Sequence, residues 1–269
     1  MEHDITLLNF DGAYNKQSFY RDKRYNWIEL EAMPNTNLLC EKDNLKLIAD
    51  KLIERGSSGG IHYLGSGNFH YISYLLQSRI KKPYTLILFD HHTDTLPSPS
   101  ESLISCGSWL LDSLQDLPML RKVFIIGVGE EASQHIPASI SNKVVIYPEK
   151  SLQSNLITII QSILNNIPTD SVYISMDKDV LDKKDALTGW DHGTLRLKQM
   201  MKMVKMLFRN EDVNGIDICG EYPVNPTNDY RRQDKDAIEK NNRANRFILK
   251  CFKQWLGRDD RSSAMLDVI

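Results

Sequence analysis

Short apolar runs rich in β-branched and aromatic residues recur along the chain and dominate its hydrophobic pattern. They cover residues 5–10, 60–65, 84–89, 122–128, 143–147, 171–176 and 213–219. Apolar runs of this length without regular polar alternation are typical of strands buried on both faces, as in a parallel sheet. We therefore predict a buried strand at each run.

Segments with helical spacing of apolar residues separate most of these runs. They cover residues 43–56, 69–80, 103–115, 152–164 and 195–208. Strands that alternate with helices of this length indicate βαβ units, in which helices cover both faces of a parallel sheet. The pattern predicts an α/β fold with a mostly parallel, doubly wound sheet.

The C-terminal part of the chain is highly charged and carries only a thin apolar stripe. The stripe consists of Ile238, Phe247, Ile248, Cys251, Phe252 and Trp255. This spacing predicts a long helix over about residues 228–256 that packs on one side and faces water on the other. Because no internal repeat or low-complexity linker divides the chain, we expect residues 1–269 to form a single domain.

Composition and charge narrow the classes of function. Of the 269 residues, 41% are hydrophobic and 25% are charged, which describes a soluble chain able to bury a large core. A formal net charge of -2 does not indicate a nucleic-acid surface, so small molecules are the expected partners. The sequence shows neither a basic leader followed by an apolar run nor an apolar stretch of about 18 residues, so we expect neither export nor a membrane span. Four cysteines without a C-x-x-C pair fit reduced thiols and a cytoplasmic location.

Polar clusters directly follow four of the predicted strands. They are GSGNFH (65–70), DHHTD (90–94), MDKDVLD (176–182) and GEYP (220–223). In open parallel sheets, ligands bind beyond the carboxyl ends of the strands. We expect the four clusters to face the same end of one sheet.

Spacing within the clusters favours convergence of their side chains. Asp90, His92 and Asp94 stand two residues apart, so an extended strand end would point them to one side and His91 to the other. Asp177 and Asp179 have the same spacing, and His70 adds a second imidazole from the first cluster.

Four carboxylates in one cleft repel one another unless cations neutralise them, and a pair of divalent ions would do so. Carboxylate and imidazole ligands without thiolates favour Mn²⁺ or a similar ion over a structural zinc. Two such ions would bridge and deprotonate a water molecule, which makes hydroxide available near neutral pH.

The motifs Asp90-x-His92-x-Asp94 and Ser175-x-Asp177-x-Asp179-x-x-Asp182 together resemble the paired signatures of the arginase, or ureohydrolase, family. This family includes arginases, agmatinases and formimidoylglutamases, and the resemblance covers roughly residues 60 to 226. It implies a three-layer α/β/α sandwich and a centre of two Mn²⁺ ions. By motif position, the ligands would be His70, Asp90, His92, Asp94, Asp177 and Asp179.

The resemblance also implies an activity. A metal-bridging hydroxide would hydrolyse a linear C–N bond in a guanidino, amidino or related small molecule. Asp94 would be the metal-linked carboxylate that shuttles the proton, and Glu221 would bind the cationic group of the substrate. The family often forms trimers or hexamers, so the resemblance also allows a homo-oligomer.

The sequence departs from the family pattern in places. GSGNFH places His70 one residue out of step with the usual Gly-Gly-Asp-His or Gly-Gly-Asn-His, and Cys106-Gly107 stands where many members have a proton-transferring histidine before glycine. The family's Asp-Pro after the second motif is also missing, since Lys183 follows Asp182. Two alternatives therefore stay open, which are a one-zinc, deacetylase-like amidohydrolase and a non-catalytic, metal-binding protein of the same fold.

Overall fold

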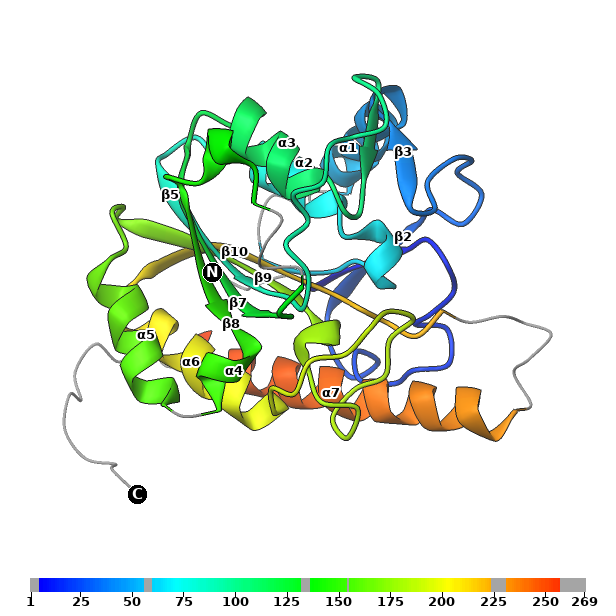
Figure 1. Cartoon of the computed structure of the whole chain (residues 1–269). Helices are drawn as coiled ribbons and strands as arrows, with labels where there is room; N and C mark the ends of the chain where they lie inside the picture. The colour runs from blue at the N-terminus through cyan, green and yellow to red at the C-terminus, as the bar shows by residue number, and fades with distance from the viewer. Residues whose placement is uncertain (1–4, 56–59, 132–135, 154, 224–230, 257–269) are drawn as a thin grey trace.

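The computed structural model describes residues 5–55, 60–131, 136–153, 155–223 and 231–256, and its centre is an eight-stranded sheet (Figure 1). The strand order is β2-β1-β4-β10-β9-β5-β7-β8, and all neighbours pair in parallel. The strands are β1 (Ile5–Asn9), β2 (Tyr25–Glu29), β4 (Ile61–Tyr63), β5 (Tyr84–Phe89), β7 (Leu120–Val128), β8 (Val144–Pro148), β9 (Ser171–Asp177) and β10 (Asp212–Cys219). A separate antiparallel pair joins β3 (Leu39–Glu41) to β6 (Leu103–Ser105).

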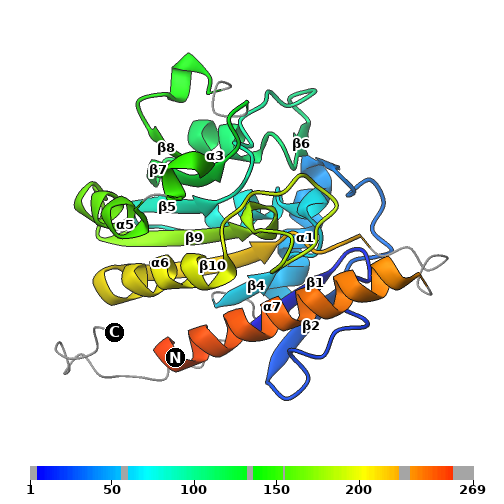
Figure 2. The same cartoon turned by 60° about the horizontal axis from the view of Figure 1, so that its bottom comes forward.

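Helices cover both faces of this sheet (Figures 1 and 2). One face carries α1 (Lys42–Glu54), α2 (Ile72–Gln77) and α3 (Trp109–Asp116), and the other carries α5 (Leu156–Asn165), α6 (Leu197–Asn210) and α7 (Arg232–Leu256). The short helix α4 (Glu149–Leu152) follows β8, and the 3₁₀ turns are η1 (Gly67–Phe69), η3 (Ala138–Ile140) and η4 (Lys178–Val180). The predicted three-layer α/β/α arrangement is confirmed.

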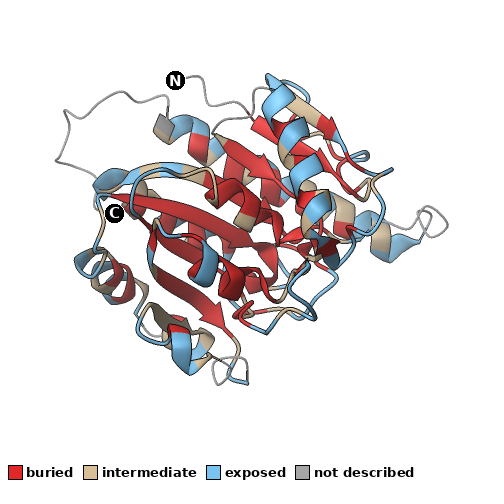
Figure 3. Cartoon of the chain, turned by 90° about the horizontal axis from the view of Figure 1, so that it is seen from above, coloured by how far each residue is buried: buried red, intermediate tan, exposed pale blue. Residues whose placement is uncertain are grey.

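Strand β5 shows how the sheet separates two apolar cores. Leu86 and Leu88 pack with α1, α2 and α3, whereas Ile87 and Phe89 pack with α5, α6 and α7. All residues of β5 are buried, as is most of the central sheet in Figure 3. Burial on both faces explains why the sequence shows continuous apolar runs there, since alternate residues face different cores.

The structure adds elements that the apolar pattern does not reveal. Strand β2 lies at one edge of the sheet and buries only Ile28, so it lacks a continuous apolar run. The predicted helix over 103–115 instead begins with strand β6, and helix α3 starts at Trp109. The C-terminal helix starts at Arg232, and residues 228–230 of the predicted helix lie outside the described residues.

Across the residues that the structure describes, no helix combines the length and apolar character needed to cross a bilayer.

Candidate metal centre

The four polar clusters meet at one edge of the sheet because the strands that precede them are neighbours. Strands β4, β10, β9 and β5 are adjacent and parallel, so their carboxyl ends lie together. His70 ends the turn after β4, Asp90 follows β5, Asp177 ends β9, and Glu221 comes shortly after β10. All four side chains are buried.

One imidazole nitrogen lies among three carboxylates. His70 Nδ1 is 3.3 Å from Asp90 Oδ2, 3.2 Å from Asp94 Oδ2 and 3.5 Å from Asp177 Oδ2. His70, Asp90 and Asp94 thus offer three ligand atoms that all lie within 4.8 Å of one another. Carboxylates crowded in this way repel one another unless protons or a cation neutralise part of their charge.

A second group of ligands lies beside the first and shares Asp90 with it. His92 Nδ1 is 2.9 Å from Asp179 Oδ2 and 3.6 Å from Asp90 Oδ1. Asp90, His92 and Asp179 also bring three ligand atoms within 4.8 Å of one another. The two adjoining clusters therefore hold five of the six sequence-predicted metal ligands, and the sixth, Asp177, lies beside the first cluster with its Oδ2 3.5 Å from His70 Nδ1.

The backbone of residues 90–94 is not extended, although the spacing of Asp90, His92 and Asp94 suggests an extended strand end. Residues 91 and 92 form a bend, and Asp94 has a left-handed φ of +50°. The Asp94 carboxylate is fixed by Trp109, whose Nε1 donates a 2.6 Å hydrogen bond to Oδ2. Asparagine and aspartate tolerate this backbone region better than most residues, which explains why a carboxylate can occupy it.

Glycines allow the backbone to approach Asp177 closely. Gly220 has a φ of +84°, and a Cβ atom at this position would lie 2.4 Å from Asp177 Oδ1. Any larger residue would therefore displace a predicted ligand.

Crowding shifts the pKa of both carboxylates and imidazoles. Burial, followed by repulsion from Asp90, raises the pKa of Asp94 to about 6. Burial and repulsion from Asp177 and Asp90 raise the pKa of Asp179 well above its usual value. Burial opposes the charged form of His92, yet hydrogen bonds to Asp179 and Asp90 raise its pKa to about 12. The cluster therefore holds protons where metal ions would otherwise supply positive charge.

The chemistry of this donor set fits a pair of divalent ions. Asp90 Oδ2 is buried and accepts no hydrogen bond, although His70 Nδ1 lies near it. Carboxylate and imidazole ligands suit Mn²⁺ among the common divalent metals.

A chain of buried hydrogen bonds orients His70. Its Nε2 lies 3.0 Å from Ser175 Oγ, and Ser175 Oγ donates a 2.6 Å hydrogen bond to Asp217 Oδ1. Ser175 on β9 is directly opposite Asp217 on β10 in the register of the sheet. Such partners fix the ring orientation and strengthen the imidazole as a ligand.

Replacing Ser175 with alanine is expected to weaken metal binding by about 10- to 100-fold, because it breaks this chain while leaving every ligand in place. Titration of the metal-free protein with Mn²⁺ measures the change. Ser171→Ala is the matched control, since Ser171 is buried on the same strand and hydrogen-bonds Pro83 O away from the centre. Equal metal affinity of the two variants would contradict a positioning role for Ser175.

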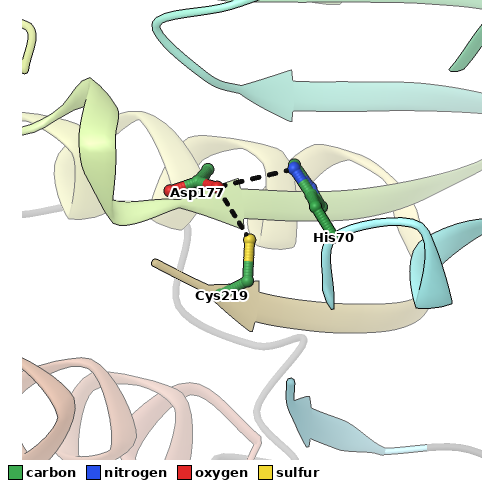
Figure 4. A group of neighbouring side chains, drawn as sticks. All are labelled: His70, Asp177 and Cys219. Carbon is green, nitrogen blue, oxygen red and sulfur yellow. Dashed lines mark hydrogen bonds and ion pairs between the residues drawn. The ribbon is translucent and has the colours of Figure 1, made fainter. Parts of the chain in front are cut away.

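Cys219 is a neighbour of the centre that the sequence reasoning missed (Figure 4). Its Sγ donates a hydrogen bond to Asp177 Oδ2 at 3.0 Å, and His70, Asp177 and Cys219 have ligand atoms within 4.8 Å of one another. Burial raises the pKa of this thiol well above its usual value, so it stays protonated in the metal-free site. The structure therefore adds a neutral thiol to the surroundings of Asp177. The only signal in the sequence was that Cys219 ends a buried run before Gly220.

His91 supports one of the predicted ligand carboxylates through its backbone. The backbone N–H of His91 donates to Asp179 Oδ1 at 3.0 Å. Asp182 lies outside the clusters and caps a turn, since its Oδ1 accepts a hydrogen bond from Lys184 N at 2.8 Å.

Trp190 is 39% exposed, and its ring centroid is 5.9 Å from that of His92. Burial, followed by repulsion from Asp94, raises the pKa of the Cys106 thiol to about 12.

Glu221 reaches the same edge of the sheet, where an internal cation pairs with it. It forms an ion pair with Lys178 Nζ and accepts hydrogen bonds from Asn245 Nδ2 at 2.6 Å and Gln17 Nε2 at 2.8 Å. Lys178 was not singled out from the sequence, although it stands between two predicted ligands in Asp177-Lys178-Asp179.

The sequence resembles that of known proteins over most of its length. A model of the Arginase family matches residues 43–240, which is more than half of the chain. A protein of Thermotoga maritima described as uncharacterized is 29% identical over 241 residues, and the match covers 87% of this chain and 85% of that protein.

Solved structures share the fold. Proclavaminate amidino hydrolase from Streptomyces clavuligerus has a TM-score of 0.69 at 14% identity, with 94% of this chain and 91% of that chain covered. Formimidoylglutamase from Bacillus subtilis has a TM-score of 0.63 at 17% identity, with 94% and 88% covered. Arginase from Bacillus caldovelox has a TM-score of 0.62 at 17% identity, with 91% and 98% covered. At these identities the likeness shows the fold alone.

Proposed function

The chain belongs to the arginase family, and from this premise we propose that it is a two-metal hydrolase of a linear C–N bond in a small molecule. The observation that carries the proposal is the pair of ligand clusters that share Asp90. In two-metal hydrolases, neighbouring ions share ligands in this way and act on one reacting centre.

We assign one Mn²⁺ ion to each cluster. The first would be held by His70, Asp94 and Asp177, the second by His92 and Asp179, and Asp90 would contribute to both. When bound, the ions supply Lewis acidity at the scissile bond and make a nucleophile available near neutral pH.

Asp94 is the group that we assign to proton transfer. Its Oδ2 accepts the hydrogen bond from Trp109 and lies near His70, so Oδ1 is the atom assigned to hold the proton. During hydrolysis, water adds to the trigonal carbon, the C–N bond breaks, and the proton passes to the leaving nitrogen. A carboxylate beside the reacting centre can accept this proton and release it again.

A screen of the manganese-loaded protein tests the proposed reaction. Guanidino, amidino, ureido, carboxamide and N-acetyl compounds would be incubated with it, and urea, ammonia and acetate would be measured. Metal-dependent release of urea or ammonia is the expected result. Release of acetate alone would support the one-zinc, deacetylase-like alternative, and no release from any compound would support the non-catalytic one.

Cys106→Ser is expected to reduce kcat by less than about tenfold, whereas loss of a general acid or base costs roughly 10²- to 10⁴-fold. The reason is that a thiol with a pKa of about 12 stays protonated at neutral pH and cannot act as a base. Steady-state kinetics on a substrate found in the screen measure the effect. A loss of 100-fold or more would show that Cys106 takes part in proton transfer.

A further inference from the structure

We propose that Lys178 is a built-in counter-ion for Glu221, and that the substrate is therefore a neutral linear amide, such as a ureido or carboxamide compound, at its reacting end. The inference rests on the proposed hydrolase function and narrows its substrate class. It departs from the expectation that Glu221 binds a cationic group of the substrate.

Internal donors engage both oxygens of the Glu221 carboxylate. Oε1 faces Lys178 Nζ and accepts from Asn245 Nδ2 at 2.6 Å, while Oε2 accepts from Gln17 Nε2 at 2.8 Å. Asn245 Nδ2 also donates to Gln17 Oε1 at 2.9 Å, which links the two amides into one network. Glu221 is 1% exposed and Lys178 is 0% exposed. These donors occupy three of the roughly four acceptor positions of the carboxylate, so little of Glu221 is left to pair with a substrate cation.

The ion pair and its hydrogen bonds join three separate parts of the chain. It belongs to η4 after β9, Glu221 follows β10, and Asn245, whose Oδ1 accepts from Lys178 Nζ at 3.3 Å, belongs to helix α7. A buried ion pair with further hydrogen bonds is costly to break, because removal of one partner leaves the other charge unpaired.

Charge balance at the centre follows from this pairing. The carboxylates of Asp90, Asp94, Asp177 and Asp179 would balance the two proposed divalent ions, and Lys178 balances Glu221. Because Lys178 already pairs with Glu221, a guanidinium or amidinium would lose its water shell without gaining Glu221 as a partner, which is unfavourable. A neutral amide adds no charge.

Asp11 is a half-buried carboxyl group near Glu221, and its oxygens are engaged by internal donors. Its oxygens accept hydrogen bonds from the backbone N–H groups of Ala13 and Ser66, each at 3.2 Å. Burial raises its pKa, so it is a poor replacement for Glu221 as a partner of a cation.

Two amide side chains lie beside Trp190 at the edge of the centre. Trp190 Nε1 donates to Asn68 Oδ1 at 3.0 Å, and Asn68 Nδ2 donates to Asn37 Oδ1 at 2.8 Å. A Cβ atom on Gly67 would lie 2.9 Å from Trp190 Cδ1 and 3.1 Å from Asp177 Oδ2, so the indole lies next to a predicted ligand.

Methylguanidinium and N-methylurea test the substrate class directly, because they have nearly the same shape and differ in charge. Their binding to the manganese-loaded wild-type protein would be measured by calorimetry. We expect N-methylurea to bind at least tenfold more tightly. Equal binding, or tighter binding of methylguanidinium, would overturn the inference.

Chemical rescue tests the counter-ion role without any turnover. Lys178→Ala is expected to lower the melting temperature, and ethylammonium is expected to restore part of it, whereas ethanol at the same concentration is not. Lys178→Met is the matched control, since it fills the space without a charge and should be destabilised but not rescued. Failure of ethylammonium to stabilise Lys178→Ala, or equal stabilisation of the wild-type protein, would overturn the counter-ion role.

The two proposals can fail separately. Metal-dependent hydrolysis of a guanidino compound would overturn the neutral-substrate inference and leave the proposed hydrolase function intact. Absence of bound metal would overturn the hydrolase function, while the ethylammonium result would still decide the role of Lys178.

Discussion

Asp179→Asn is expected to lower kcat by about 1000-fold and to remove one metal ion per chain. Asparagine keeps the shape of the side chain but removes the negative charge that pairs with His92. Stabilisation by a catalytic metal ion is worth several kcal/mol, and each 1.4 kcal/mol or so is a tenfold change in rate. Metal analysis and steady-state kinetics on the same preparation measure both effects.

Asp182→Asn is the matched control for this variant. Asp182 belongs to the same sequence motif, but its carboxylate caps a turn and accepts from Lys184 N. The variant should keep both metal ions and nearly all activity. If Asp179→Asn retained both ions, or if Asp182→Asn lost one, the assignment of the second cluster would be wrong.

Metal affinity is expected to rise with pH, by up to about 100-fold per unit near neutral pH. The pKa of His92 is raised to about 12, because its hydrogen bonds to Asp179 and Asp90 outweigh the effect of burial. Burial also opposes the charged form of His70, but its hydrogen bonds with Asp90 and Asp94 raise its pKa well above the usual value. Both imidazoles are therefore protonated in the metal-free site and must lose a proton to bind metal, and each displaced proton contributes about tenfold per pH unit.

Calorimetric Mn²⁺ titrations between about pH 6 and 8, in buffers of different ionisation enthalpy, count the released protons. His92→Asn should reduce the pH dependence by one proton. His62→Asn is the matched control, because burial lowers the pKa of His62 to about 4 and this ring is already neutral over the tested range. An affinity that does not change with pH would contradict the assignment of His70 and His92 as ligands.

The central strands could be predicted because burial on both faces gives continuous apolar runs, as in β5 and β9. Edge strand β2 could not, since it buries only Ile28. The short strands β3 and β6 could not be predicted either. Each has three residues, and their antiparallel pairing depends on segments far apart in the sequence.

The convergence of the candidate ligands could be expected from their places after parallel strands, since carboxyl ends of adjacent strands meet. The surroundings of those ligands could not be expected in the same way. Lys178 and Glu221 meet Asn245 only because helix α7 packs below the sheet edge, and Cys219 reaches Asp177 only across neighbouring strands. Such contacts depend on tertiary packing, which no local pattern in the sequence records.

The number of metal ions per chain tests the central claim most directly. The purified protein would be incubated with Mn²⁺, freed of unbound metal and analysed for bound metal against protein concentration. Two ions per chain is the predicted result. One zinc ion per chain would instead support the deacetylase-like alternative, and no bound metal would contradict the proposed hydrolase.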